Sequence, residues 1–129
     1  GLEIPEEYVR EGVYHDPDRC AELTRELLQL PEPPTCILMP DDFSSIGGGN
    51  AIRRMGLRFP EDVSAAGYDG IQLASVTNPA MTTYRQDTAA LGKTAAAKLI
   101  ELIEKPRTAL VDRILIPGKL VEGGSVRAI

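Results

Sequence analysis

Three side chains that can bind a small molecule stand at the ends of short apolar runs: Tyr14, Asp41 and Asp69. If these runs are parallel strands with helices behind them, the three side chains converge at the carboxyl edge of one sheet. That edge is where open α/β sheets bind ligands. An aromatic ring can stack on the apolar face of a ligand, and carboxylates accept its OH or NH protons. The pattern therefore favours a polyhydroxylated or nitrogenous small-molecule ligand.

Structural roles explain the same three residues equally well. Asp is a preferred residue at helix N-caps and in turns, so Asp41 can cap a helix and Asp69 can close a turn. Tyr14 can pack at the edge of a sheet. Position at a strand end does not separate the two interpretations, and both stay open at this point.

The adjacent acids Asp41 and Asp42 are also typical of carboxylate ligands for a hard cation such as Mg²⁺. Such a site needs a supporting Lys or a third acid at another strand end, and the sequence offers no convincing partner. Helix capping accounts for the same pair. We therefore predict no metal site, and keep a carboxylate-dependent Mg²⁺ enzyme as the less favoured alternative.

Other catalytic signatures are weak. The run from Gly47 to Asn50 lacks the Lys-Ser/Thr continuation of a phosphate-binding P-loop. His15 is the only histidine, so any Ser-His-Asp or Cys-His apparatus would have to use it. It stands beside a predicted helix cap, which favours a solvated loop residue. We predict no covalent catalysis and no cofactor.

Size and composition are those of an ordinary soluble protein. The chain has 129 residues, enough for about one domain, and a net charge of -5 that argues against binding nucleic acid by itself. No apolar stretch approaches the roughly 20 residues that cross a bilayer, and no signal peptide begins the chain. We expect a cytoplasmic protein. Cys20 and Cys36 are too few for a disulfide framework, and Cys36 is expected to be buried.

Apolar patterns, caps and breakers alternate between strand and helix, which predicts an α/β fold with a mainly parallel sheet and helices on both faces. Asp16 and Pro17 open the first helix, and Gly56 ends the second. The Gly-rich run at 47–49 lies inside that second helix, where each Gly costs up to about 1 kcal/mol relative to Ala. Helices are predicted at 17–30, 43–55 and 87–105, and strands at 8–14, 35–39, 63–67, 82–85, 111–116, 120–121 and 125–127.

Three segments, in this order, resemble the sugar- and metabolite-responsive repressors of the LacI/GalR type: residues 34–69 (PTCILMPDDFSSIGGGNAIRRMGLRFPEDVSAAGYD), 81–87 (MTTYRQD) and 115–125 (LIPGKLVEGGS). The resemblance spans nearly the whole chain. It implies an incomplete periplasmic-binding-protein-like lobe, so that residues 1–129 form a partial effector-binding domain. Residues 1–81 would belong to the carboxy-terminal lobe, 87–105 to a helix that crosses to the other lobe, and 111–129 to return strands. The helix-turn-helix headpiece of the family has no counterpart here.

The resemblance also implies roles for individual residues. Asp69 matches the pocket aspartate that accepts hydrogen bonds from the effector, and Tyr14 falls where the family places a stacking aromatic residue. Gln86 falls at the lobe crossover, near the ligand in some members. Asp41 stands where the family usually has Asn. The helix over 43–55 would line a dimer interface, for which we predict the residues Ile46, Gly49, Asn50 and Arg53.

The leading hypothesis is an effector-sensing domain, without catalytic activity, of a LacI-family transcriptional regulator. A sugar or small metabolite would bind between two lobes and change the operator affinity of the parent protein. The expected partners are this effector, a second copy of the chain, and operator DNA reached only through a headpiece outside this sequence. No membrane partner is expected. A sugar-binding receptor without a DNA-binding role is the nearest alternative.

Overall fold

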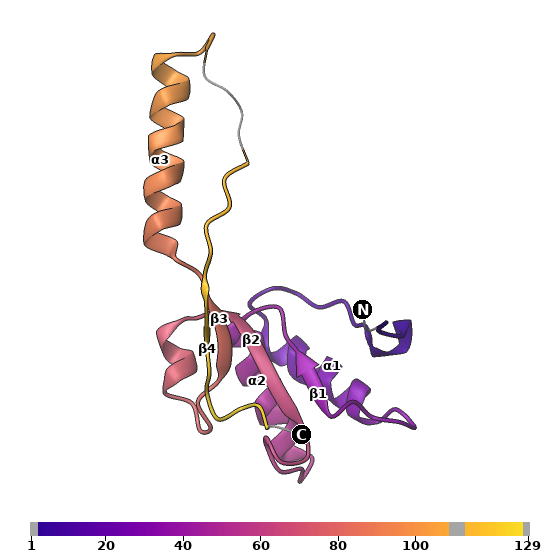
Figure 1. Cartoon of the computed structure of the whole chain (residues 1–129). Helices are drawn as coiled ribbons and strands as arrows, with labels where there is room; N and C mark the ends of the chain where they lie inside the picture. The colour runs from indigo at the N-terminus through magenta and orange to yellow at the C-terminus, as the bar shows by residue number, and fades with distance from the viewer. Residues whose placement is uncertain (1–2, 109–112, 128–129) are drawn as a thin grey trace. The chain divides into compact units, whose positions relative to one another are not determined.

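The computed structural model describes residues 3–108 and 113–127 (Figure 1). The chain divides into two units, Gly1–Arg85 with Leu120–Ile129, and Gln86–Lys119, and each is described by itself. The elements in chain order are η1 (Glu6–Tyr8), α1 (Pro17–Leu28), β1 (Cys36–Leu38), α2 (Asp42–Arg54), β2 (Ser64–Asp69), η2 (Gln72–Ser75), β3 (Thr82–Arg85), α3 (Thr88–Glu104) and β4 (Lys119–Val121).

The strands form one sheet in the order β1-β2-β3-β4. β1 pairs parallel with β2, with Cys36 opposite Ser64, and β2 pairs parallel with β3, with Ala66 opposite Thr82. The α/β class and the mainly parallel sheet are thus confirmed. The strand predicted at 82–85 matches β3 in full, whereas β2 begins one residue later than predicted and continues to Asp69.

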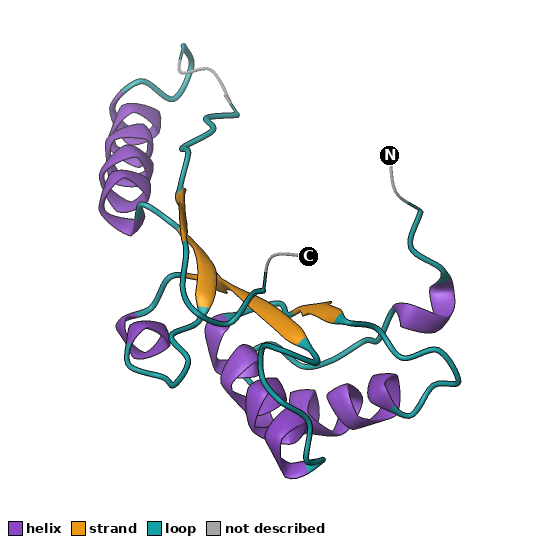
Figure 2. Ribbon diagram, turned by 60° about the horizontal axis from the view of Figure 1, so that its bottom comes forward, coloured by secondary structure: helices purple, strands orange, loops and turns teal. Residues whose placement is uncertain are grey.

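Helices α1 and α2 lie together on one side of the sheet (Figure 2). Asp16 caps α1 by accepting the N–H of Arg19 at 2.9 Å, and Pro17 takes the first helical position, as predicted. Within the Gly run of α2, Gly47 is explained by close contact between the two helices. A Cβ on Gly47 would stand 2.0 Å from the carbonyl oxygen of Pro17, so only Gly permits this approach.

The core lies between these two helices and the sheet. Side chains alternate between the faces of a strand, so Ile37 and Ala65 are buried toward the helices. Leu38 and Tyr68 lie on the opposite face and are 79% and 42% exposed. The residues of the core cluster are Leu27, Leu28, Ile37, Met39, Ile52, Phe59, Val63, Ala65, Ala74 and Met81.

The segment after β4 is hydrogen-bonded to β2 and β3 near the first residues of both strands. Ser125 is buried, accepts the N–H of Thr82 on its hydroxyl oxygen at 2.7 Å, and donates that hydroxyl to the carbonyl of Ala65 at 2.7 Å. The carbonyl of Ser125 also accepts the N–H of Ala65 at 2.9 Å. Ser125 therefore connects β2 with β3. Residues 125–127, predicted as a strand piece, are a loop.

Three further predictions were wrong, one of them in part. Residues 8–14 form no strand: η1 ends at Tyr8 and a loop follows, because no described strand pairs with this segment in a hydrogen-bonded ladder. Cys36 is exposed, because β1 is an edge strand and Cys36 points to the face away from α1 and α2. Of the strand predicted at 111–116, residues 113–116 are a loop and 111–112 lie outside the described residues.

The second unit consists mainly of α3, which matches the helix predicted at 87–105. Asp87 caps it by accepting the N–H of Ala90 at 2.9 Å. Two of its apolar side chains, Leu99 and Ile103, are 59% and 70% exposed. Among residues 3–108 and 113–127, no helix combines the length and apolar character needed to cross a membrane.

Candidate functional site

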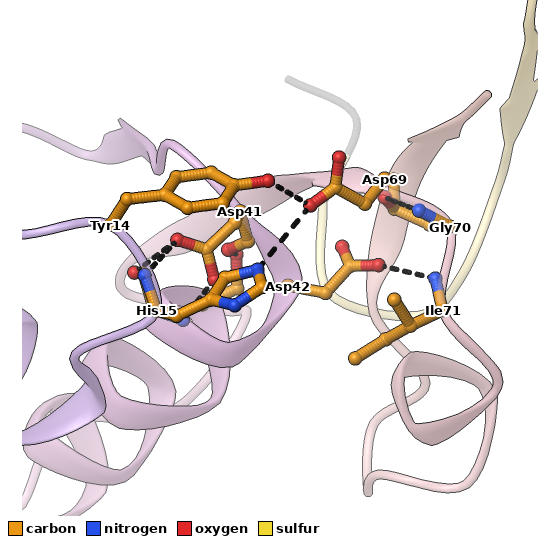
Figure 3. A network of polar contacts seen from close by, with 10 residues as sticks. Tyr14, His15, Asp41, Asp42, Asp69, Gly70 and Ile71 are labelled. Atoms are coloured by element: carbon orange, nitrogen blue, oxygen red, sulfur yellow. Dashed lines mark hydrogen bonds and ion pairs between the residues drawn. The ribbon is translucent and has the colours of Figure 1, made fainter. Parts of the chain in front are cut away.

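Tyr14 and Asp69, which are 55 residues apart in the sequence, meet at the carboxyl end of β2 (Figure 3). The hydroxyl of Tyr14 donates to Oδ2 of Asp69 at 2.5 Å. Asp69 is the last residue of β2, and Tyr14 comes from the loop before α1. The structure thus brings together two of the four predicted ligand-binding residues.

The backbone conformation at the end of β2 sets the orientation of the Asp69 carboxylate. Asp69 has φ 100° and Gly70 has φ 70°, so both lie in the left-handed region, which Asp tolerates better than most residues. The N–H of Gly70 donates to Oγ1 of Thr83 on β3 at 3.2 Å, which holds this turn. Asp69 therefore also fulfils the predicted turn role. Its side chain is only 15% exposed.

The ring of Tyr14 remains accessible while its hydroxyl is engaged. It stacks on His15 with a centroid distance of 4.2 Å and is 55% exposed. The hydrogen bond to Asp69, with smaller effects from burial and neighbouring carboxylates, raises the pKa of Tyr14 to about 12. Such a ring offers a flat apolar surface beside a carboxylate acceptor, as the binding hypothesis requires.

His15 is an exposed residue in the loop before α1, as predicted, and it also contacts Tyr14, Asp41 and Asp69. Its backbone has φ 60° and its N–H donates to Oδ2 of Asp41 at 3.0 Å. Its Nε2 lies 3.9 Å from Oδ2 of Asp69, and its ring meets the ring of Phe43 edge-on at 5.2 Å. Only its position next to Tyr14 could have indicated this from the sequence.

Asp41 caps α2, which confirms the structural interpretation of this residue. It is buried; Oδ1 accepts the N–H of Ser44 at 2.9 Å, while Oδ2 accepts the hydroxyl of Ser44 at 2.7 Å and the N–H of His15. Burial alone would raise the pKa of Asp41, but these hydrogen bonds outweigh it and hold the pKa below its ordinary value. Both oxygens thus accept hydrogen bonds from the protein itself.

Asp42 is buried at the first position of α2, and its Oδ2 accepts the N–H of Ile71 at 2.8 Å (Figure 3). Its Oδ1 has no hydrogen-bond partner among the described residues. Within residues 3–108 and 113–127, no three His, Cys, Asp or Glu side chains are grouped so that they could hold a metal ion.

The four residues predicted for a dimer interface line one cavity of about 230 Å³. The guanidinium of Arg53 lies 5.0 Å from the centre of the Phe59 ring and donates to the carbonyl of Asn78. A Cβ on Gly49 would stand 3.1 Å from the same ring, so Gly49 also packs within its own chain. Gln86, the fourth predicted ligand-binding residue, begins the second unit, and its contact with a ligand stays a prediction. The cavity is lined by Ile46, Gly49, Asn50, Arg53, Phe59, Thr77, Asn78, Pro79 and Met81.

The parallel α/β sheet with polar residues at its carboxyl edge is the architecture of a ligand-binding lobe. Residues 1–126 match the family model of the periplasmic binding protein-like domain, and the chain belongs to this family. In sequence it is similar to the "Probable HTH-type transcriptional repressor ExuR" of Bacillus subtilis (strain 168), with 33% identity over 99% of this chain and 38% of the relative. The chain thus spans about two fifths of the length of that relative.

Solved structures of transcriptional regulators have the same fold. The transcriptional regulator CelR in complex with cellobiose superposes with a TM-score of 0.87 and 29% identity, over 96% of this chain and 37% of CelR. The lac repressor dimer bound to operator superposes with a TM-score of 0.77 and 30% identity, over 85% of this chain and 38% of the repressor. The predicted resemblance to LacI-type regulators and the periplasmic-binding-protein-like fold are confirmed.

Proposed function

We propose that this chain is part of the effector-sensing core of a LacI-type transcriptional regulator and that Asp69 accepts hydrogen bonds from the effector. The observation that carries the proposal is the carboxylate of Asp69, held at the carboxyl end of β2 beside the accessible ring of Tyr14. A carboxylate and an aromatic face next to each other suit a ligand with hydroxyl groups and an apolar face.

The effector is a sugar or another small metabolite. CelR, which shares the fold over 96% of this chain, is bound to cellobiose in its solved structure, and this supports the ligand class. The site provides binding rather than catalysis. The carboxylate of Asp41 caps α2, and that of Asp42 accepts the N–H of Ile71. Relatives such as ExuR are repressors.

The effector lies between two lobes, and Gln86 contacts it from the crossover between them. The division of the chain at Arg85 and Gln86 supports this arrangement, in which α3 belongs with the other lobe. Two copies of the parent protein associate through the surface around Ile46, Asn50 and Arg53. Operator DNA binds to a headpiece outside this sequence. The lac repressor dimer on its operator, with 30% identity to this chain, supports both partners.

Operator binding tests the regulatory role. Fluorescence anisotropy would follow the parent protein on DNA from its own promoter, with and without cellobiose or lactose. A bound sugar should change the affinity for DNA by about 5- to 150-fold, the usual range of allosteric coupling. Sugar binding without any affinity for DNA would favour the receptor alternative. DNA binding that no sugar changes would contradict the proposed effector class.

A further inference from the structure

The acceptor oxygen Oδ2 of Asp69 is occupied by a donor from the same chain. The hydroxyl of Tyr14 lies 2.5 Å from Oδ2, the short distance of a hydrogen bond to a charged oxygen. Nε2 of His15 lies 3.9 Å from the same oxygen, and the carboxylate is only 15% exposed. A ligand donor that takes the position of the Tyr14 hydroxyl on Oδ2 must therefore displace that hydroxyl.

The two sides of this contact differ in how freely they move. Asp69 is fixed at the end of β2 by the sheet and by the turn at Gly70. His15 is held through its backbone N–H by Asp41. The side chain of Tyr14, by contrast, is 55% exposed and is held mainly by this hydrogen bond and by stacking on His15. When the contact opens, the hydroxyl of Tyr14 can turn to water while Asp69 stays in place.

We propose that the Tyr14 hydroxyl occupies the effector's position on Asp69, so that a ligand binds only if it brings its own hydroxyl or amine donor to Oδ2. This inference rests on the proposed function and assigns Tyr14 a second role besides stacking. A ligand that displaced the Tyr14 hydroxyl without bringing a donor would remove one hydrogen bond from Oδ2 of Asp69 and put nothing in its place, which is unfavourable. Tyr14 is then a specificity-determining residue for donor-bearing ligands.

The replacement also lowers the affinity for the correct effector, because one hydrogen bond is exchanged for another. Tyr14→Phe keeps the ring but removes the competing hydroxyl. The intact parent protein with this substitution should bind its sugar about 3- to 10-fold more tightly, the low end for a hydrogen bond to a charged group because the phenol is half exposed. If the hydroxyl instead contacts the sugar or builds the site, the same substitution weakens binding.

Calorimetry with cellobiose and with lactose on the intact parent protein measures this effect. Tyr8→Phe is the matched control, because the hydroxyl of Tyr8 donates to the carbonyl of Glu32 at 2.9 Å and is not bonded to Asp69. The affinity of the Tyr8→Phe protein for the sugar should stay within about twofold of wild type. Tighter binding by Tyr14→Phe, or binding to Tyr14→Phe alone, supports the proposal. Unchanged or weaker binding overturns it and leaves the sensing function intact, whereas binding of neither sugar to either protein contradicts both.

A crystal structure of the sugar-bound parent protein gives an independent readout. The Tyr14 hydroxyl should lie beyond about 3.5 Å from Oδ2 of Asp69, outside hydrogen-bond distance, with a sugar oxygen in its former place. A sugar bound at the site with the Tyr14 contact to Asp69 retained would overturn the proposal.

Discussion

Gly67 on β2 lies directly against the carboxylate of Asp42 at the start of α2. A Cβ on Gly67 would stand 2.5 Å from Oδ1 of Asp42 and 2.5 Å from Oγ of Ser45, closer than a carbon and an oxygen can approach. Oδ2 of Asp42 in turn accepts the N–H of Ile71, just beyond Asp69. The missing side chain thus lets α2 approach the sheet and lets Asp42 hold the loop that follows the candidate ligand acceptor.

Gly67→Ala should therefore destabilise the protein and disturb the site. The new methyl group forces the carboxylate of Asp42 and the hydroxyl of Ser45 to move, and overpacking of this kind costs about 1–3 kcal/mol. Urea unfolding of the parent protein measures the loss. Gly92→Ala on α3 is the control, because its Cβ meets nothing within 4 Å and Ala is the better helix former. If both substitutions have the same effect, the contact between Gly67 and Asp42 does not limit the packing.

Asp42 should tolerate Asn better than Ala. The buried carboxylate accepts one N–H and leaves Oδ1 without a partner among the described residues, so its charge is costly to bury. Asp42→Asn keeps an acceptor for Ile71 and removes the charge, and should match or exceed wild type in stability at neutral pH. Asp42→Ala leaves the N–H of Ile71 unpaired and should cost about 1–3 kcal/mol. Urea midpoints measure both, and a strongly destabilised Asn variant would indicate a cationic partner for Asp42.

Stability should fall in acid partly through Asp62. Hydrogen bonds from the side chain and the N–H of Arg58 lower the pKa of Asp62 to about 2, below its ordinary value of 3.8. The folded state thus favours the charged form, so the stabilisation is complete above the ordinary pKa and is lost as pH falls from about 4 to about 2. The stability difference between wild type and Asp62→Asn, measured by urea unfolding from pH 7 downwards, should shrink across this window. A difference that does not change with pH contradicts the role of the Asp62 charge.

Arg53 should contribute to self-association of the parent protein. Its guanidinium lies over Phe59 at the cavity that we propose as part of the dimer surface. A preorganised Arg is a frequent hot spot, so Arg53→Ala should weaken the dimer by about 10-fold or more in sedimentation equilibrium. Arg54→Ala, an exposed neighbour on the same helix outside the cavity, should leave it unchanged. Equal effects of the two substitutions would contradict the assignment of this cavity to the dimer interface.

Local sequence signals predicted much of this fold. The predicted caps Asp16 and Asp41 each accept an N–H three residues later, since a short polar side chain before a helix acts on its immediate neighbours. The strand at 82–85 and Gly56 at the end of α2, with φ 77°, were also predicted, because both follow from the residues at and next to these positions.

Features that depend on distant parts of the chain were not predictable. The run at 8–14 has strand-like residues but no ladder partner among the described residues, and the exposure of Cys36 follows from the edge position of β1. His15 lies in the site because its N–H donates to Asp41, 26 residues away, and because its backbone is left-handed, which the sequence does not indicate. Tyr14 and Asp69 were predicted to converge, but the hydrogen bond between them was not.

The central claim is that Asp69 accepts a hydrogen bond from the effector, and titration calorimetry of Asp69→Asn tests it most directly. Cellobiose and lactose would be titrated into the parent protein as wild type, as Asp69→Asn and as the control Asp62→Asn, whose acid pairs with Arg58. A sugar that binds wild type should bind Asp69→Asn about 3- to 10-fold more weakly, because its hydrogen bond replaces that of Tyr14 on the same oxygen and only part of its strength is lost; the control should be unchanged. Binding to Asp69→Asn within about twofold of wild type would contradict the account.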